Sequence, residues 1–290
     1  LTGKHSKANG VIGNSSNWNG KQWVYPRELG KAGYQTALIG KWHLKGNPTD
    51  EFQHWDILSG KGGQGSYFNP VFLSANGERR TLGHSTKIIT DKTLKWLKER
   101  DKKMPFLVCA QYKTPHIHRL PPPKFMGQYD RVDFPVPQTF FDDFSTRSSF
   151  VSETWMALKG MKGHVLNIAP SESEIKANPK LMPPFLREMT PPQRTAWHQA
   201  YDPRNLKMKE LEESGKLNGE NRPLYIYQRF IKDYIRCVDG LDDQVGRLLR
   251  YLDQAGLKDN TIVIYSSDQG FFTGEHGWAE KRWMYEESFK

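Results

Sequence analysis

The sequence predicts an α/β fold with a mostly parallel central sheet and helices on both faces of the sheet. Three observations lead to this prediction: β-like runs that are apolar throughout, helical patterns between them, and polar or glycine-rich sequence directly after each run. Runs without polar alternation are typical of strands that are buried on both faces of a parallel sheet. Repetition of helix, strand and polar loop indicates a sheet covered by helices.

Three strands are predicted from such runs. They lie at residues 34–42 (YQTALIGKW), 105–112 (PFLVCAQY) and 260–265 (NTIVIY). Residues 60–65, GKGGQG, match the dinucleotide-binding pattern G-x-G-x-x-G, but Tyr-Phe-Asn-Pro follows where a helix should begin. We therefore interpret residues 60–65 as a loop.

The helices are predicted from apolar periodicity. Between residues 227 and 252, apolar side chains recur on one helical face, and Gly256 follows as a C-cap. Shorter helices are predicted at residues 23–31 and 88–100. Residues 114–190 are rich in Pro, Asp, Ser and Lys, and they predict a long irregular excursion with short helices that shapes a substrate site.

Composition excludes some classes of protein. The 290 residues are 37% hydrophobic, which is typical of a globular protein, and no apolar run is long enough to span a membrane. The net charge is +10, but the basic residues are scattered. This charge permits an anionic substrate. It also suggests a nucleic-acid-binding module, but no other feature of the sequence supports that hypothesis. Cys109 and Cys237 are too few for a disulfide framework and are interpreted as small buried apolar residues.

The predicted strands place reactive side chains at one edge of the sheet, because ligands bind outside the carboxyl ends of the strands in open α/β sheets. Carboxylate and amide oxygens suit Ca²⁺ or Mg²⁺, although an Asp at a strand end also caps turns. Lysines suit an anion with several oxygens, and histidines suit proton transfer, although a structural role is an alternative for each histidine. Together they predict metal-assisted cleavage of a tetrahedral oxyanion ester. The residues are Lys41, His43, His116, His118, Asp268, Gln269 and Lys281.

Four segments resemble motifs of type I (formylglycine-dependent) sulfatases in the alkaline-phosphatase superfamily. Residues 33–44 (GYQTALIGKWHL) resemble the second signature of the family, and residues 267–288 (SDQGFFTGEHGWAEKRWMYEES) resemble its metal- and sulfate-binding segment. Residues 114–125 (TPHIHRLPPPKF) resemble its middle histidine motif, and residues 1–11 (LTGKHSKANGV) resemble the segment after the formylglycine signature. The resemblance covers the chain in order and implies an alkaline-phosphatase/sulfatase-like fold.

The resemblance implies a role for each site residue. Lys41 would contact both sulfate and formylglycine, and His43 would hydrogen-bond the formylglycine hydroxyl. His116 would protonate the leaving alcohol, and Lys281 would hold a sulfate oxygen. Asp268 and Gln269 would ligate Ca²⁺, in preference to Mg²⁺. His276 matches the family pattern, but no catalytic role is carried over to it.

Two departures from the family pattern stand out. His118 occupies a position where the family has Pro, so that either His116 or His118 is the general acid, with His116 preferred. The formylglycine precursor and further metal ligands are expected upstream of Leu1. We therefore expect residues 1–290 to be a partial catalytic domain, without the C-terminal subdomain of the family and inactive alone.

The resemblance is strongest to bacterial carbohydrate sulfatases of the N-acetylglucosamine-6-sulfatase type. It implies a sulfated glycan substrate, no nucleic-acid partner, and a periplasmic or secreted enzyme if bacterial or a lysosomal one if animal. Two alternatives remain open. One is a phosphonate or phosphate ester hydrolase of the same superfamily, and the other is a non-catalytic glycan-binding relative.

Overall fold

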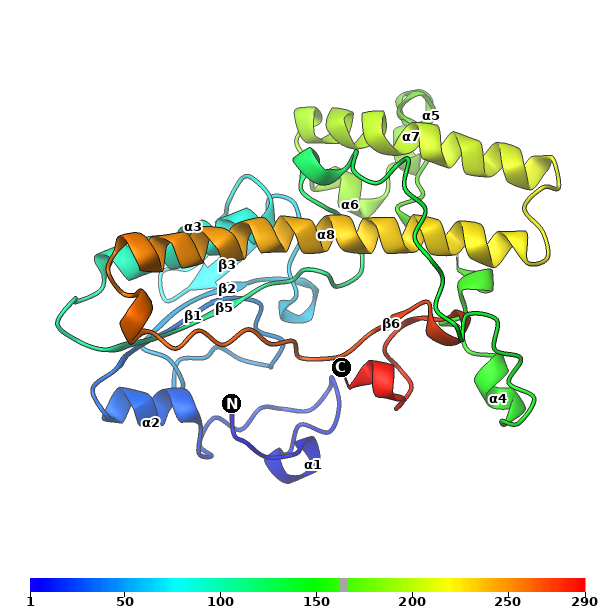
Figure 1. Ribbon diagram of the computed structural model, residues 1–290. Helices are drawn as coiled ribbons and strands as arrows, with labels where there is room; N and C mark the ends of the chain where they lie inside the picture. Colours follow the sequence, from blue (N-terminus) through cyan, green and yellow to red (C-terminus); the bar gives the residue numbers. More distant parts are fainter. Residues whose placement is uncertain (162–165, 290) are drawn as a thin grey trace. The chain divides into compact units, whose positions relative to one another are not determined.

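The structure is a computed structural model that describes residues 1–161 and 166–289 (Figure 1). The chain divides into two compact units. The first unit comprises Leu1–Thr114 and Leu241–Asp259, and the second comprises Pro115–Gly240 and Asn260–Lys290. Among the helices of the described ranges, none is both long and apolar enough to cross a membrane.

The first unit is built on a five-stranded sheet with the order β4-β3-β2-β1-β5. β1 pairs in parallel with β2 and with β5, whereas β3 pairs antiparallel with β2 and with β4. The predicted α/β fold is therefore confirmed, with a parallel centre extended at one side by an antiparallel hairpin. The strands are β1 (Gln35–Gly40), β2 (His54–Leu58), β3 (Val71–Ser74), β4 (Gly77–Arg80) and β5 (Phe106–Gln111).

Both faces of this sheet are covered. Because successive side chains of a strand point to opposite faces, Leu38 and Ile39 in β1 belong to different core clusters. Leu38 packs with Trp55 on the face near α2 (Tyr25–Lys31), where the Tyr25 hydroxyl lies 3.4 Å from Cys109 Sγ. Ile39 packs with buried residues of α3 (Ser85–Glu99) on the other face, and Figure 1 shows α2 and α3 on opposite sides of the sheet.

The predicted helices are also confirmed. α2 and α3 correspond to the predictions at residues 23–31 and 88–100, and α8 (Asn221–Gln254) extends the prediction at residues 227–252 at both ends. In the first unit, α8 is linked to α3 by an ion pair of 2.7 Å between Arg247 and Asp91. Residues 60–65 form a loop with one 3-10 turn, η1 (Lys61–Gly63), as predicted. The remaining short helices associated with this unit are α1 (Ser6–Asn9) and η6 (Lys258–Asn260).

The third predicted strand is wrong. Residues 260–265 are not assigned to any strand of the described structure, and Figure 1 shows residues after η6 as an extended trace. Ile262 is 90% exposed and Ile264 is 84% exposed. A strand requires a neighbour to accept and donate its backbone hydrogen bonds, and the described residues supply none for this segment. The prediction from apolar composition alone therefore gave the sheet one strand too many.

The second unit consists mainly of helices. α7 (Pro191–Glu213), which the sequence analysis did not predict, begins with a capping box between Thr190 and Gln193 and has Pro at its first position. α7 lies beside α8 (Figure 1), and the Tyr201 hydroxyl donates a hydrogen bond of 2.8 Å to Asp233 Oδ1. The other elements of the unit are η2 (Pro123–Phe125), α4 (Ser149–Ser152), η3 (Leu158–Gly160), α5 (Glu172–Ala177), η5 (Pro179–Leu181), α6 (Pro184–Arg187), β6 (Phe272–Thr273), η7 (Glu275–Gly277), β7 (Ala279–Glu280) and η8 (Glu286–Ser288).

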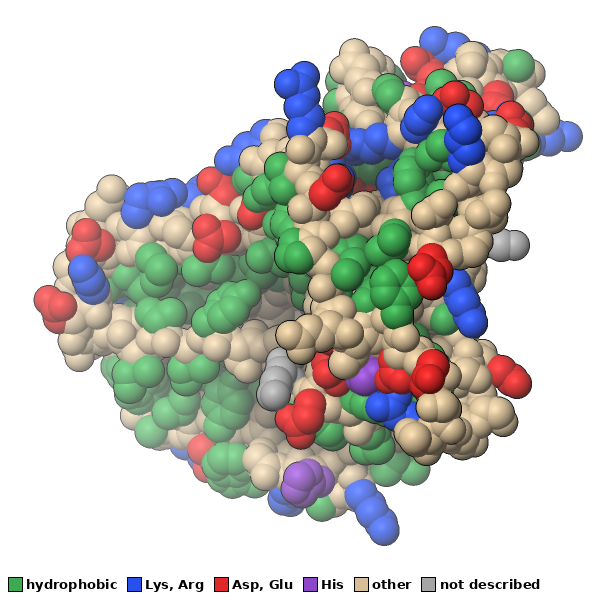
Figure 2. All heavy atoms as spheres, turned by 45° about the vertical axis from the view of Figure 1, so that its right-hand side comes forward, with side chains coloured by type: hydrophobic (Ala, Val, Ile, Leu, Met, Phe, Trp, Pro, Cys, Tyr) green, Lys and Arg blue, Asp and Glu red, His purple; other side chains and the backbone are tan. Residues whose placement is uncertain are grey.

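The surface carries dispersed charge. On the face drawn in Figure 2, Lys and Arg side chains are scattered among acidic, hydrophobic and other surface. This agrees with their scatter along the sequence.

Candidate active site

Lys41 and His43 follow β1 in the first unit. The backbone N–H of Lys41 donates to the carbonyl oxygen of Gln111 at 2.7 Å, which continues the β1–β5 ladder by one residue. This close approach requires glycine before the lysine, because Gly40 has φ +114° and a Cβ there would lie 2.0 Å from Gln111 O. The Lys41 side chain is half-buried and His43 is exposed. The end of a rigid central strand therefore positions Lys41.

His116 and His118 lie in the loop after β5, at the start of the second unit. His116 Nδ1 lies 2.7 Å from the carbonyl oxygen of Ile117. When Nδ1 carries a proton and donates it to this carbonyl oxygen, Nε2 is the nitrogen that can gain or lose a second proton. Nε2 is then an acceptor in the neutral ring and a donor in the charged ring. His118 is placed differently, because its ring packs against Phe185 with centroids 5.9 Å apart.

Asp268 and Gln269 lie in an exposed segment of the second unit. The Gln269 side-chain amide donates to the carbonyl oxygen of Ser288 at 2.9 Å, and the N–H of Gly270 donates to the same oxygen at 3.1 Å. Because Nε2 is held in this way, Oε1 is the atom that Gln269 can offer to a cation. A carboxylate beside an amide oxygen is a donor set that suits Ca²⁺. Within residues 1–161 and 166–289, no group of three or more His, Cys, Asp or Glu could hold a metal ion.

Lys281 follows β7, the second strand of the small β6–β7 hairpin. Its side chain is half-buried, and Nζ lies 5.8 Å from the centre of the Phe271 ring. An ammonium group is attracted to the face of an aromatic ring, so the ring restricts the position of the Lys281 side chain. Of the two lysines predicted for the site, Lys281 belongs to the second unit and Lys41 to the first.

The loop with the two histidines and the segment with Lys281 are joined by an ion pair that the sequence analysis missed. Arg119 Nη2 lies 3.2 Å from Glu280 Oε1, and both side chains are buried. Arg119 follows His118 directly and Glu280 precedes Lys281 directly. The two partners are 161 positions apart, so nothing in the sequence indicated that they pair. Their adjacency to predicted site residues was the one feature that could have drawn attention to them.

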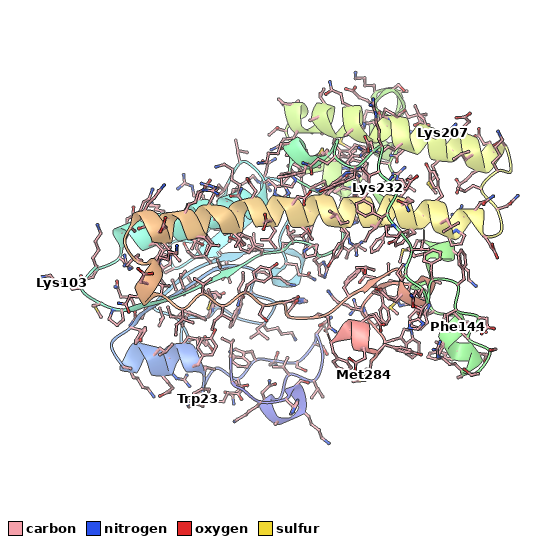
Figure 3. The ribbon with its side chains drawn as sticks, viewed as in Figure 1. Trp23, Lys103, Phe144, Lys207, Lys232 and Met284 are labelled. Carbon is pink, nitrogen blue, oxygen red and sulfur yellow. The ribbon has the colours of Figure 1, made fainter. Side chains whose placement is uncertain are left out.

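His276 is part of a buried aromatic cluster. Its Nδ1 lies 2.6 Å from Asp142 Oδ2, and Asp142 also pairs with Arg147. Burial raises the pKa of Asp142, but hydrogen bonds from Arg147, the Phe144 backbone and His276 outweigh it and lower this pKa to about 2. The Phe144 ring (labelled in Figure 3) stacks on Trp278 with centroids 5.2 Å apart. These contacts give His276 a structural role.

Residues 133–147 carry several phenylalanine rings, which can either stack on sugar rings or pack the fold. Phe140 is buried in the core of the second unit and contacts Tyr227. Phe144 stacks on Trp278, as described above. Phe141 is 53% exposed. Phe140 and Phe144 therefore pack the fold, as does the partly buried Phe134, whereas Phe141 exposes about half of its surface.

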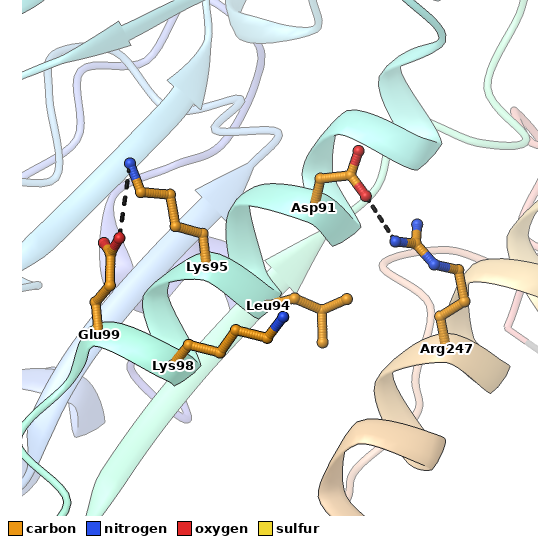
Figure 4. A pocket seen from close by; sticks show the side chains of 6 residues that line it. All are labelled: Asp91, Leu94, Lys95, Lys98, Glu99 and Arg247. Atoms are coloured by element: carbon orange, nitrogen blue, oxygen red, sulfur yellow. Dashed lines mark hydrogen bonds and ion pairs between the residues drawn. The ribbon is translucent and has the colours of Figure 1, made fainter.

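An open depression of about 290 Å³ lies between α3 and the part of α8 in the first unit (Figure 4). Two ion pairs lie along it, Lys95–Glu99 at 3.8 Å and Asp91–Arg247 at 2.7 Å. None of the predicted site residues lines this depression. We interpret it as ordinary surface between two helices.

The chain is similar to proteins of known structure and family. A phosphonate monoester hydrolase from Silicibacter pomeroyi shares its fold, with a TM-score of 0.53 and 16% identity over 99% of this chain and 55% of that protein. A sulfatase family model matches residues 1–290, and the chain therefore belongs to the sulfatase family.

Two relatives are much more similar. The chain is 39% identical to an N-acetylglucosamine-6-O-sulfatase of Bacteroides thetaiotaomicron, over 99% of this chain and 51% of that protein. A solved structure in complex with its substrate D-glucosamine-2-N,6-O-disulfate matches with a TM-score of 0.93 and 38% identity, over 100% of this chain and 58% of that protein. The chain thus spans about half the length of these relatives.

Proposed function

We propose that the chain is part of a sulfuric ester hydrolase that removes the 6-O-sulfate from a sulfated amino sugar of a glycan. One observation carries the proposal: 39% identity, over 99% of the chain, to an N-acetylglucosamine-6-O-sulfatase. The structural match to the complex with disulfated glucosamine supports the same substrate class. A sulfated carbohydrate is also consistent with the predicted lysines and histidines at the strand ends.

The residues of this chain would bind the sulfate and protonate the leaving group. Lys41 and Lys281 supply positive charge for sulfate oxygens, which gain negative charge as the ester bond breaks. His116 is preferred as the general acid, because its Nδ1 bond to the Ile117 carbonyl orients the ring and leaves Nε2 to carry the transferred proton. His118 packs on Phe185, which supports a positioning role for that ring. His43 would hydrogen-bond the nucleophile.

Two further groups belong to the proposal. A formylglycine from outside residues 1–290 would supply the nucleophile, and Ca²⁺ would supply positive charge next to the sulfate. Asp268 Oδ and Gln269 Oε1 would hold the cation, because the Gln269 amide nitrogen is already bonded to the Ser288 carbonyl. Ca²⁺ takes six to eight oxygen ligands, so Asp268 and Gln269 would supply only part of its coordination.

A substrate panel tests the activity. The matured full-length enzyme should release sulfate from 6-O-sulfated glucosamine and N-acetylglucosamine faster than from 3- or 4-O-sulfated sugars. Turnover of p-nitrophenyl phosphate or phosphonate esters without sulfate release would contradict the proposal and favour the phosphonate or phosphate ester hydrolase. Glycan binding without any turnover would favour the non-catalytic relative.

A leaving-group comparison tests the general acid. His116→Ala should slow hydrolysis of a sugar sulfate roughly 100- to 10,000-fold, because an alkoxide leaving group needs a proton. Hydrolysis of p-nitrophenyl sulfate should slow much less, because p-nitrophenolate leaves without protonation. His5→Ala, which changes an exposed histidine, serves as the control. An equal loss on both substrates would contradict this role and would direct the same test to His118.

Thermal unfolding tests the cation. Ca²⁺ added to EGTA-treated full-length protein should raise Tm in the wild type, because a ligand that binds the folded state stabilises it. Asp268→Asn should abolish this increase, whereas the exposed control Asp259→Asn should retain it. The same increase in Asp268→Asn would remove Asp268 from the proposed ligand set.

A further inference from the structure

The ion pair between Arg119 and Glu280 is buried, and within the described residues two guanidinium nitrogens of Arg119 have no hydrogen-bond partner. Both side chains are almost completely inaccessible, with 0% and 4% of their surface exposed, and Nη2–Oε1 is 3.2 Å. No described residue accepts a hydrogen bond from Arg119 Nε or Nη1. Instead, the guanidinium lies over three aromatic rings, 4.7 Å from the centre of Phe230, 4.9 Å from that of Phe271 and 5.9 Å from that of Tyr234.

Stability is a weak explanation for this pair. Removing two charges from water costs roughly as much as their attraction returns, and apolar replacements of buried ion pairs are often equally stable. Two unsatisfied guanidinium nitrogens add to the cost. A pair with so little net benefit to folding calls for another explanation, and its location provides one.

The pair ties together two segments that carry predicted site residues. Arg119 lies three positions after His116, and its carbonyl oxygen accepts a hydrogen bond of 2.8 Å from Asn167 Nδ2. Glu280 lies directly before Lys281, in the β6–β7 hairpin. Glu280 also has φ +87°, a conformation that costs an ordinary residue energy and persists only when its surroundings impose it.

One aromatic ring links the pair to Lys281 directly. The Phe271 ring has the Arg119 guanidinium 4.9 Å from its centre and the Lys281 ammonium 5.8 Å from it. The position of Arg119 therefore helps to fix the ring on which Lys281 rests, and Glu280 fixes the backbone from which Lys281 extends. Both partners of the ion pair constrain the same lysine.

We propose that Arg119 and Glu280 are positioning residues that hold Lys281 in a fixed place relative to the His116 loop. This inference rests on the proposed function, in which Lys281 binds the sulfate and His116 protonates the leaving oxygen. Neither Arg119 nor Glu280 needs to touch the substrate. Loss of their pairing displaces Lys281, and displacements of about 1 Å in an active site can cost a factor of roughly 100 in rate.

A double-mutant cycle in the matured full-length enzyme tests the inference. Glu280→Gln keeps the shape of the side chain and removes its charge, and it should lower kcat/KM for the sulfated sugar roughly 10- to 100-fold. In an enzyme that already carries Lys281→Ala, the same change should have little further effect, because the pair acts through Lys281. Additive losses would overturn the inference, and so would a fully active Glu280→Gln.

Apolar replacement separates positioning from folding. The double variant Arg119→Met with Glu280→Leu should unfold near the wild-type temperature, because no unpaired charge is left buried, yet it should stay as slow as Glu280→Gln. Arg247→Met, which removes an ion pair of the first unit, is the control and should retain kcat/KM. Recovery of activity together with stability in the double variant would show that the pair is only structural.

A readout without catalysis distinguishes this inference from the proposed function. A wild-type enzyme that hydrolyses no sulfate ester would refute the proposed function. The positioning inference is then judged by hydrogen exchange of the backbone amides at residues 279–282. Exchange should be faster in Glu280→Gln than in the wild type and unchanged in Arg247→Met, and unchanged exchange in Glu280→Gln would overturn the inference.

Discussion

The carboxylate of Asp233 is the centre of a buried hydrogen-bond network between α7 and α8, and its replacement by Asn should be costly. Asp233 accepts hydrogen bonds from Tyr201 Oη at 2.8 Å, Asn167 Nδ2 at 2.8 Å and Arg236 Nη1 at 2.7 Å. An Asn side chain retains one acceptor oxygen and turns a new donor toward groups that are themselves donors. It also leaves the guanidinium of Arg236 without its buried countercharge.

The magnitude follows from these contacts. Removing one partner of a buried ion pair costs about 3 to 5 kcal/mol. Arg236 retains a second acidic partner, Asp130 at 2.7 Å, and this places the expected loss for Asp233→Asn at about 3 kcal/mol, near the lower end of that range. A loss of that size lowers Tm by roughly 5 °C in a chain of 290 residues, and by less in the longer full-length protein.

Urea and thermal unfolding of the full-length protein provide the assay, with Asp242→Asn as the control. Asp242 is an exposed Asp on the same helix, so its replacement should change the free energy of unfolding by no more than about 0.5 kcal/mol. The reasoning would be refuted by a loss below about 1 kcal/mol for Asp233→Asn, or by equal losses for the two variants.

Three further predictions concern other parts of the molecule. The pKa of Asp142 is about 2, below its ordinary value of 3.8, so its contribution to stability is present above about pH 4 and is lost as the pH falls toward 2. Asp142→Asn should therefore remove roughly 1 to 2 kcal/mol of the pH-dependent stability measured by urea unfolding between pH 2 and 5, after allowance for solvent screening. Gly40→Ala should destabilise by roughly 2 to 4 kcal/mol, because a Cβ would lie 2.0 Å from Gln111 O at φ +114°, whereas the control Gly30→Ala in α2 should be neutral or stabilising. Burial raises the pKa of the Cys109 and Cys237 thiols. Both thiols should therefore react with a thiol reagent at pH 8 at least about tenfold more slowly in the folded protein than in urea. Fast labelling of the folded protein would contradict this prediction.

Periodicity in the sequence predicted those helices and strands whose local residue pattern is sufficient to specify them. The apolar face of α8 and the apolar runs of β1 and β5 could be recognised from their own residues, although β5 is only half-buried whereas β1 is almost completely buried. α7 was missed, because its first residues are two prolines and its interior contains Pro203. The run at 260–265 was overestimated, because a strand depends on a neighbour and the run itself carries no information about one.

The places of two candidate site residues in the fold followed from the sequence, whereas Asp268 and Gln269 do not follow a strand of the described structure, because residues 260–265 do not form one. Lys41 lies at the end of β1 and His116 lies after β5, since a strand end can be located from its own residues. The link between Arg119 and Glu280 could not be predicted, because it depends on how two distant segments pack. The same is true of the Asp142–His276 contact, which gives a structural role to a histidine in a family motif.

Residues 261–266, TIVIYS, combine high β-propensity with no charge, no proline and no glycine, and their apolar side chains are largely exposed. Six-residue segments of this kind are the templates from which cross-β aggregates grow when their backbone groups are unpaired. Residues 1–290 produced by themselves should therefore self-associate through this segment as their concentration rises. Replacing Val263 with Lys would place a gatekeeper charge within it and should keep the polypeptide monomeric.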